Sequence, residues 1–201
     1  MSSPSCPITG EPRCKCEFEM EPISAPTVKE MLRKLFTDHA NYTHLYLLAE
    51  ILNLPNLKCI TNRLLENQVD IGLAVKPIFG AVKSEALINL LKTHIIDAST
   101  VVKAAKKSAD SKSDQKAKDA LDQAVANLFE NSTEVSELIG SVKPKILPFK
   151  EVKTHFDQHN HYVIALAGLY IKRKYKAAVT EYDCYYNHMI HFSDLLSLLA
   201  T

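Results

Sequence analysis

The sequence predicts an all-α protein, an up-and-down antiparallel bundle of four to five long helices. The chain has 201 residues, 46% of them hydrophobic and 23% charged, with only 5 Gly, so it can bury one sizeable core. Apolar residues recur at helical spacing over long stretches, and no stretch alternates apolar and polar residues as a half-buried strand would. The long segments have similar lengths and are joined mostly by short turns, which favours antiparallel neighbours.

The first segment, residues 1–26, is a polar, Pro-rich arm without helical periodicity, and residues 27–201 form the bundle domain. The arm carries Cys6, Cys14 and Cys16, which supply three thiolates where a structural zinc site uses four ligands. Two readings therefore remain for the arm: a zinc knuckle that borrows a fourth ligand, or a packed arm with free thiols.

The first long helix has the best-marked start in the chain. Thr27 and Glu30 have the spacing of a capping box and follow Pro26, and the helix is expected to end where Asn53 and Leu54 precede Pro55. From Asn56 to about Gly80, residues that interrupt helices divide the pattern into shorter pieces. We therefore expect a connector of short helices in this stretch.

Four more long helices are expected after the connector. The turn at residues 108–114 separates the first two, which form a helical hairpin, and Pro144 and Pro148 interrupt the chain before the third. Their expected ranges are about 81–107, 114–140, 148–172 and 175–200.

Several classes of function find no support in the sequence. The N-terminus lacks the basic and apolar regions of an export signal, and no apolar run reaches the ~20 residues that span a bilayer, so an intracellular protein is expected. The odd number of Cys also fits a reducing compartment. No Gly-rich phosphate loop, nucleophile elbow or His-Glu-x-x-His motif occurs, so a non-enzymatic protein is favoured.

One group of residues stands out, because four predicted helices each place a histidine on the row of apolar residues that faces the core. These are His39, His94, His159 and His188. Each lies about a dozen residues from the start of a helix of about 25, and the midpoints of antiparallel helices coincide. The sequence therefore predicts one layer of four imidazoles in the middle of the bundle.

Such a layer has two readings. It could bind one transition-metal ion, Zn, Fe, Cu or Ni, because neutral imidazole is a good ligand for each. Otherwise it is a polar core layer in which the histidines are satisfied by neighbours or by buried water. The neighbours considered are Tyr42, Thr43, Tyr46, Asn131 and Tyr185.

The sequence restricts the kind of metal site that the four histidines could form. A di-iron site of the ferritin kind is excluded, because the chain has no Glu-x-x-His tetrapeptide. His155 and His191 could extend a site but are expected to be solvated flanks. Asp97 and Asp183 could accept a hydrogen bond from a ligand or simply pair with Lys, and Cys184 is expected to be a small buried thiol.

The chain also resembles an uncharacterised bacterial family of helical-bundle proteins over roughly residues 30–196. The residues that carry the resemblance are Tyr42-Thr43, Thr61-Asn62-Arg63-Leu64-Leu65, Asn67, Val69-Asp70-Ile71-Gly72, Lys76-Pro77, Gly80, Leu90-Leu91, His94, Asn131, Glu134, His159, Tyr182-Asp183, His188 and Asp194. The chain departs from the family at Tyr42, His44 and Gln68, where Trp, Arg and Pro are usual. The added arm is similar to those of proteins from large amoeba-infecting DNA viruses such as the marseilleviruses. The resemblance implies a fold and a set of positions but no activity.

A rival to metal binding is a structural or interaction protein, a virion component if the source is viral, with an unknown protein partner or a second copy of itself. The net charge of +1 hides a cluster of basic residues at two predicted turns. Its members include Lys106, Lys107, Lys172, Arg173 and Lys174. In an up-and-down bundle these turns lie at the same end, so we expect a basic end that could contact nucleic acid or phosphate, unless it is only a solvated helix end.

Overall fold

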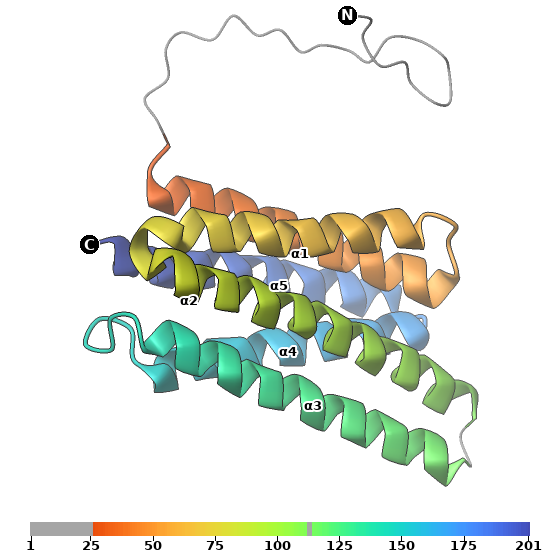
Figure 1. Ribbon diagram of the computed structural model, residues 1–201. Helices are drawn as coiled ribbons and strands as arrows, with labels where there is room; N and C mark the ends of the chain where they lie inside the picture. Colours follow the sequence, from red (N-terminus) through yellow and green to blue (C-terminus); the bar gives the residue numbers. More distant parts are fainter. Residues whose placement is uncertain (1–25, 112–113) are drawn as a thin grey trace, which may run out of the picture.

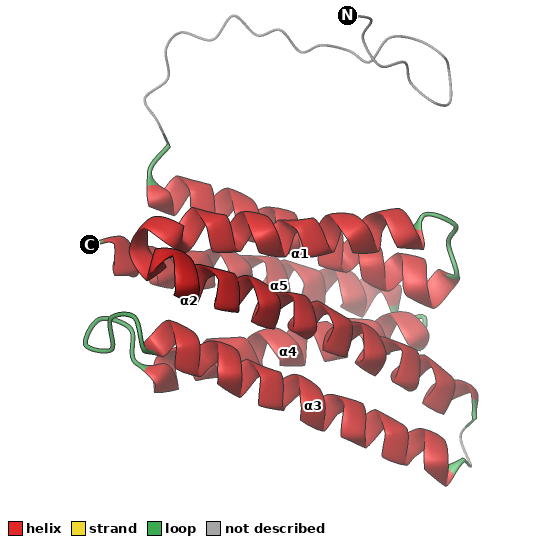
Figure 2. Ribbon diagram, in the orientation of Figure 1, coloured by secondary structure: helices red, strands yellow, loops and turns green. Residues whose placement is uncertain are grey.

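The computed structural model describes residues 26–111 and 114–201, and the predicted arm with Cys6, Cys14 and Cys16 lies outside these ranges except for Pro26. All the regular structure in the described residues is helical (Figure 2). The helices are α1 (Val28–Leu52), α2 (Leu57–Asp110), α3 (Gln115–Gly140), α4 (Phe149–Ile171) and α5 (Tyr175–Ser197), followed by the short 3-10 helix η1 (Leu198–Ala200). The predicted all-α bundle is therefore confirmed.

Helix α1 begins where the capping box predicted. The Thr27 hydroxyl accepts a hydrogen bond from the Glu30 backbone N–H at 3.2 Å, and the Glu30 carboxylate accepts one from the Thr27 N–H at 2.8 Å. This reciprocal pair satisfies two N–H groups that a helix start leaves without partners. At the other end of α1, the Lys106 ammonium donates to the Glu50 carbonyl at 2.8 Å and to Asn53 Oδ1 at 2.6 Å.

Helix α2 corrects the predicted connector of short helices. Residues 57–79 form one continuous helix, and the chain folds back at Gly80, whose backbone has a φ of 75°. The two halves of α2 then run side by side, because a Cβ atom at Gly72 would lie only 2.2 Å from Ile88 Cγ1. The Ser84 hydroxyl also donates to the Gly72 carbonyl at 2.6 Å. Gly72 is thus a close-packing position rather than the end of a short helix.

Counting the two halves of α2 separately, six helical segments follow one another in alternating directions (Figure 1). Helix α1 packs on α2 and α5, and α4 packs on α3 and α5. The start of α1 is joined to the end of α5 by Arg33, whose guanidinium donates twice to the Asp194 carboxylate at 2.6 Å. The turns α2–α3 and α4–α5 lie at one end of the bundle, as predicted (Figure 1). No helix in the described residues is long and apolar enough to cross a membrane.

Candidate functional site

Three of the four predicted histidines meet in the core of the bundle. His39 comes from α1, His94 from the second half of α2 and His159 from α4, and each lies on its helix's buried row. Their exposed fractions are 5%, 3% and 5%. His159 lies between the other two, with its ring centre 5.5 Å from that of His39 and 5.4 Å from that of His94. We call these three residues the histidine cluster.

A hydrogen bond to Asn131 on α3 fixes the orientation of the His94 ring. The Asn131 amide N–H donates to the Leu90 carbonyl at 3.1 Å, so its Oδ1 is the atom that faces His94 Nδ1 at 2.9 Å. Because Oδ1 can only accept, His94 Nδ1 carries the proton. The other ring nitrogen, Nε2, is then a lone-pair acceptor, and this buried atom has no hydrogen-bond partner among the described residues.

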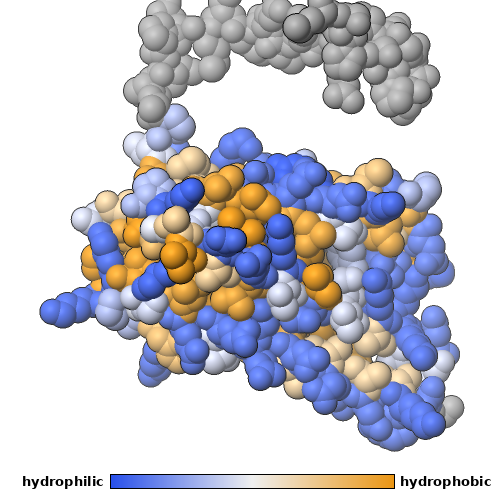
Figure 3. Space-filling model, in the orientation of Figure 1, coloured by the Kyte–Doolittle hydropathy of each residue, from blue (hydrophilic) through white to orange (hydrophobic). Residues whose placement is uncertain are grey.

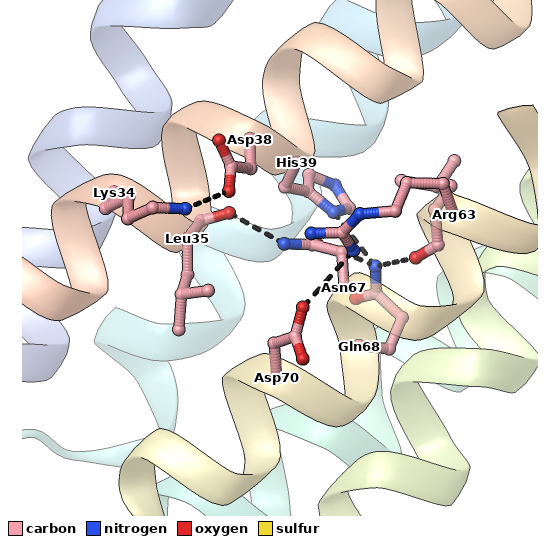
Figure 4. Close-up of polar contacts among 9 residues, drawn as sticks. Lys34, Leu35, Asp38, His39, Arg63, Asn67, Gln68 and Asp70 are labelled. Atoms are coloured by element: carbon pink, nitrogen blue, oxygen red, sulfur yellow. Dashed lines mark hydrogen bonds and ion pairs between the residues drawn. The ribbon is translucent and has the colours of Figure 1, made fainter. Parts of the chain in front are cut away.

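The His39 ring is held by the first half of α2. Gln68 Nε2 lies 3.2 Å from His39 Nδ1 and also donates to the Leu64 carbonyl at 2.8 Å. The adjacent residue, Asn67, donates to the Leu35 carbonyl of α1 at 3.0 Å, so both amides join the two helices (Figure 4). Gln68 Nε2 also lies 3.2 Å from Asn67 Oδ1, so its two N–H groups are shared among the Leu64 carbonyl, Asn67 and the His39 ring.

The His159 ring contacts mostly soft and aromatic groups. Its Nδ1 lies 3.2 Å from the Met189 sulfur, a weak acceptor, and its ring centre lies 5.5 Å from that of Tyr185. Phe156 meets His94 edge to face at 5.5 Å. On the α4 and α5 side, the cluster therefore contacts side chains that offer it little hydrogen bonding.

Burial keeps all three imidazoles neutral. It lowers the pKa of His39 to about 3, with repulsion from His94 as a smaller cause and the Asn67 amide opposing it. Burial lowers the pKa of His94 to about 4, partly opposed by Asn131. The pKa of His159 lies well below its usual value because of burial and then repulsion by the other histidines. No carboxylate in the part of the chain that the structure describes shifts the pKa of any of the three.

Two small cavities adjoin the histidine cluster, with volumes of about 30 and 20 Å³. His39, His94 and His159 line both of them, and the larger one also touches Gln68 and Met189. A water molecule needs roughly 10–15 Å³ of such space and two to four polar partners. Each cavity is thus large enough for one water or one ion, and the remaining walls are mainly apolar.

The fourth predicted histidine, His188, lies outside the cluster, which corrects the predicted layer of four. Its Nε2 donates to the His155 carbonyl at 3.0 Å, and its ring lies 5.6 Å from His155 and 5.4 Å from Tyr162. The buried row of α5 runs through Tyr185, Met189 and Phe192. The step after Tyr185 is therefore four residues rather than three, so Met189 takes the core position predicted for His188.

The other predicted residues have mixed outcomes. Asn131 is a partner of the cluster, whereas the Tyr46 hydroxyl donates to Ser99 at 2.7 Å instead. Both Asp97 and Asp183 lack a hydrogen bond to any histidine among the described residues, and Cys184 is exposed rather than buried. His191 is exposed and His155 is partly exposed, as expected for flanking residues, and their rings lie 5.4 Å apart.

Sequence reasoning missed Gln68, Asn67 and Met189 as neighbours of the cluster. Gln68 and Asn67 fell in the expected connector, where no core row was assigned. The spacing of the residues around them could have indicated their burial. One buried row at helical intervals is formed by Leu64, Asn67, Gln68 and Ile71. Apolar residues on both sides of two amides indicate a buried helix that carries polar contacts.

Among residues 26–111 and 114–201, no group of three or more His, Cys, Asp or Glu side chains is arranged to hold a metal ion. Comparisons with protein-family models, curated proteins and solved structures find no match to this chain. What the site does must therefore be inferred from its own geometry.

Proposed function

We propose that this chain is a structural or interaction protein rather than an enzyme, and that the histidine cluster is a neutral polar layer in its core. One observation carries the proposal. His39, His94 and His159 are each at least 95% buried and contact a neutral partner at one ring nitrogen, and no acidic group of the described residues acts on them. This arrangement suits uncharged imidazoles that are not required to move protons or bind substrate.

A polar layer of this kind stabilises one register of the helices over others. Asn131 reaches His94 and the Leu90 carbonyl at once, and Gln68 reaches His39 and the Leu64 carbonyl. Sliding α2 by one turn would separate Asn131 from His94 and Leu90, and Gln68 from His39, and would leave buried polar atoms without partners, which costs ~1–3 kcal/mol for each atom. The layer therefore favours a single packing of α1, α2 and α3.

A second candidate function is the binding of one transition-metal ion, Zn, Fe, Cu or Ni, by His39, His94 and His159. The observation that favours it is the His94 Nε2 lone pair, which is buried and finds no partner in residues 26–111 or 114–201. Metal-bound imidazoles usually donate their other N–H to an oxygen acceptor, as His94 does to Asn131. His188 could serve as the fourth ligand only by giving up its bond to the His155 carbonyl.

Metal content separates the two candidates. Under the polar-layer proposal, we expect freshly purified protein to contain no stoichiometric metal and to melt at the same temperature with and without a chelator. The measurements are elemental analysis of protein purified without a nickel column, and thermal melting with and without EDTA. Stoichiometric metal that is lost in His94→Ala, with destabilisation by chelator, would support the metal site instead, because binding free energy adds to folding free energy.

We further propose that the partner of this chain is acidic and contacts the basic end of the bundle. We define the basic end as the described residues of 103–122 and 172–181, which hold nine Lys or Arg and five Asp or Glu. Lys106 caps α1 and is therefore not free to bind, whereas Lys172, Arg173 and Lys174 lie in the exposed α4–α5 turn region. A virion component or a homo-oligomer would use such a surface as well.

Heparin chromatography tests the charge of this end. We expect the protein to be retained beyond low salt, and replacing Lys172, Arg173 and Lys174 together with Glu to shift elution to clearly lower salt, because these residues attract polyanions. Reversing Lys76, at the opposite end, is the matched control. Elution at low salt that the triple reversal leaves unchanged would mean that the basic end is only a solvated helix end.

A further inference from the structure

An open groove lies at the basic end between α3 and α4, with the C-terminal part of α2 as its floor. Its volume is about 730 Å³. We call it the α3–α4 groove. Its lining residues are Val101, Ala105, Ser108, Ala109, Leu121, Asp122, Val125, Ile164, Ala165, Ala167, Gly168, Leu169, Ile171, Lys172, Lys174 and Glu181. In Figure 1, α3 diverges from α4 toward this end of the bundle.

The floor of the groove is apolar and made largely of small residues. On the α3 and α4 walls beside it, Leu121, Val125 and Ile164 are only partly buried, although they pack on the small cluster formed by Val101, Ala124 and Leu128. A Cβ atom added at Gly168 would meet no atom within 4 Å, so the groove is open above this residue. Figure 3 shows pale apolar surface at this end of the molecule between hydrophilic side chains. The floor therefore offers apolar area and allows a backbone to come close.

The groove lining has balanced charge, but the surface around it is predominantly basic. Lys172 and Lys174 lie on its α4 side, and Asp122 and Glu181 are the two acidic side chains of its lining. The groove itself is balanced, but the surrounding basic end has nine basic and five acidic side chains. An acidic segment would therefore be attracted to this end and would place its carboxylates toward Lys172 and Lys174.

We propose that the α3–α4 groove binds an amphipathic helix of an acidic protein partner. The inference rests on the proposed function as an interaction protein and names the partner's chemistry. The groove floor extends from Val101 to Ala109, which is ~12 Å or two helical turns. A helix fits this space because a gap between two helices accepts a third whose apolar residues recur at i, i+3 or i+4, and i+7. A nucleic acid would use the basic residues but not the apolar floor.

The test is binding of a fluorescent 18-residue peptide that carries Leu at i, i+3 and i+7 and Glu on the flanks of that stripe. A peptide of the same composition with Leu and Glu permuted, so that no stripe forms, is the control. We expect the striped peptide to bind with a micromolar Kd that weakens with salt, and the permuted peptide to bind at least about tenfold more weakly. Fluorescence anisotropy measures both.

Two variants locate the bound peptide. A Cβ atom at position 168 meets no atom within 4 Å, and leucine favours a helix, so Gly168→Leu is expected to fold, to occupy the groove and to weaken binding at least about tenfold. Lys172→Glu together with Lys174→Glu is expected to weaken binding similarly and to remove its salt dependence. Lys76→Glu, at the other end of the bundle, is the control and is expected to bind as the parent does.

Equal binding of the two peptides, or binding that Gly168→Leu does not weaken, would overturn the proposal and leave only charge attraction. No binding of the striped peptide would also overturn it. Sedimentation velocity adds one outcome: a dimer that Gly168→Leu converts to a monomer would assign the groove to a second copy of this chain. Metal content and chelator melting report on the core alone, so failure of the proposed polar layer is distinguishable from failure here.

Discussion

Metal-free protein is expected to lose most of its stability between neutral pH and pH 5. The unfolded-state pKa of histidine is ~6.5, whereas burial lowers the folded-state pKa to about 3 for His39 and about 4 for His94, and well below the usual value for His159. Below pH ~6.5 these histidines bind protons in the unfolded chain but stay neutral in the folded chain, so unfolding becomes more favourable. The stability is therefore fully present above that pH and is lost as pH falls toward the folded-state values.

The size of this effect follows from linkage. At pH 5 each cluster histidine favours the unfolded chain by ~2 kcal/mol, because the pH is about 1.5 units below the unfolded pKa and one unit is worth ~1.4 kcal/mol. Three such groups give roughly 6 kcal/mol, which is comparable to the whole stability of a typical domain. His188, whose pKa burial lowers to about 4, acts in the same direction, but its partial exposure reduces its share.

Urea unfolding between pH 7.5 and pH 5, with a chelator present, measures this prediction. The slope of unfolding free energy against pH is expected to approach the uptake of three protons per molecule, and His39→Gln is expected to reduce it by about one. The exposed His161 is the matched control, because His161→Gln removes a histidine without removing a buried one. A stability that stays flat from neutrality to pH 5 would contradict the neutral polar layer.

Local signals in the sequence predicted those features of the fold that depend on a few neighbouring residues. Thr27 and Glu30 mark the start of α1 because the capping box needs only residues within one turn. Pro148 likewise precedes the first residue of α4, where its fixed φ and missing N–H are tolerated. Burial of His39, His94 and His159 also followed from the apolar rows on their helices.

The features that were wrong depend on contacts between segments distant along the chain. Asn67, considered alone, predicts an interruption of the helix. In the structure it is buried within α2, and the Leu35 carbonyl of α1 accepts its hydrogen bond. Gly72, considered alone, predicts a turn, but in the structure it allows Ile88 to pack on the backbone of the first half of α2. On α5, His188 and Met189 are equally consistent with an apolar row that steps by three or four residues, and only packing against α4 selects Met189.

Replacing Gly80 by Ala is expected to destabilise the protein by ~1–3 kcal/mol through the backbone alone. Gly80 has φ 75° and ψ 168°, a conformation that residues with a Cβ atom rarely adopt. A Cβ atom there would meet nothing within 4 Å, so no clash contributes to the cost. If the backbone relaxed instead, the two halves of α2 would separate and the Gly72–Ile88 contact would be lost.

Gly168→Ala is the matched control for Gly80→Ala, because both add one methyl group into open space. Gly168 lies inside α4 with an ordinary helical backbone, so alanine there is expected to stabilise the protein by ~0.5–1 kcal/mol. The same Gly→Ala substitution is therefore expected to change the free energy of unfolding in opposite directions at the two positions. Urea midpoints at pH 7.5 measure both changes. If Gly80→Ala were neutral or stabilising, the sharp reversal of α2 would not depend on the positive φ of Gly80.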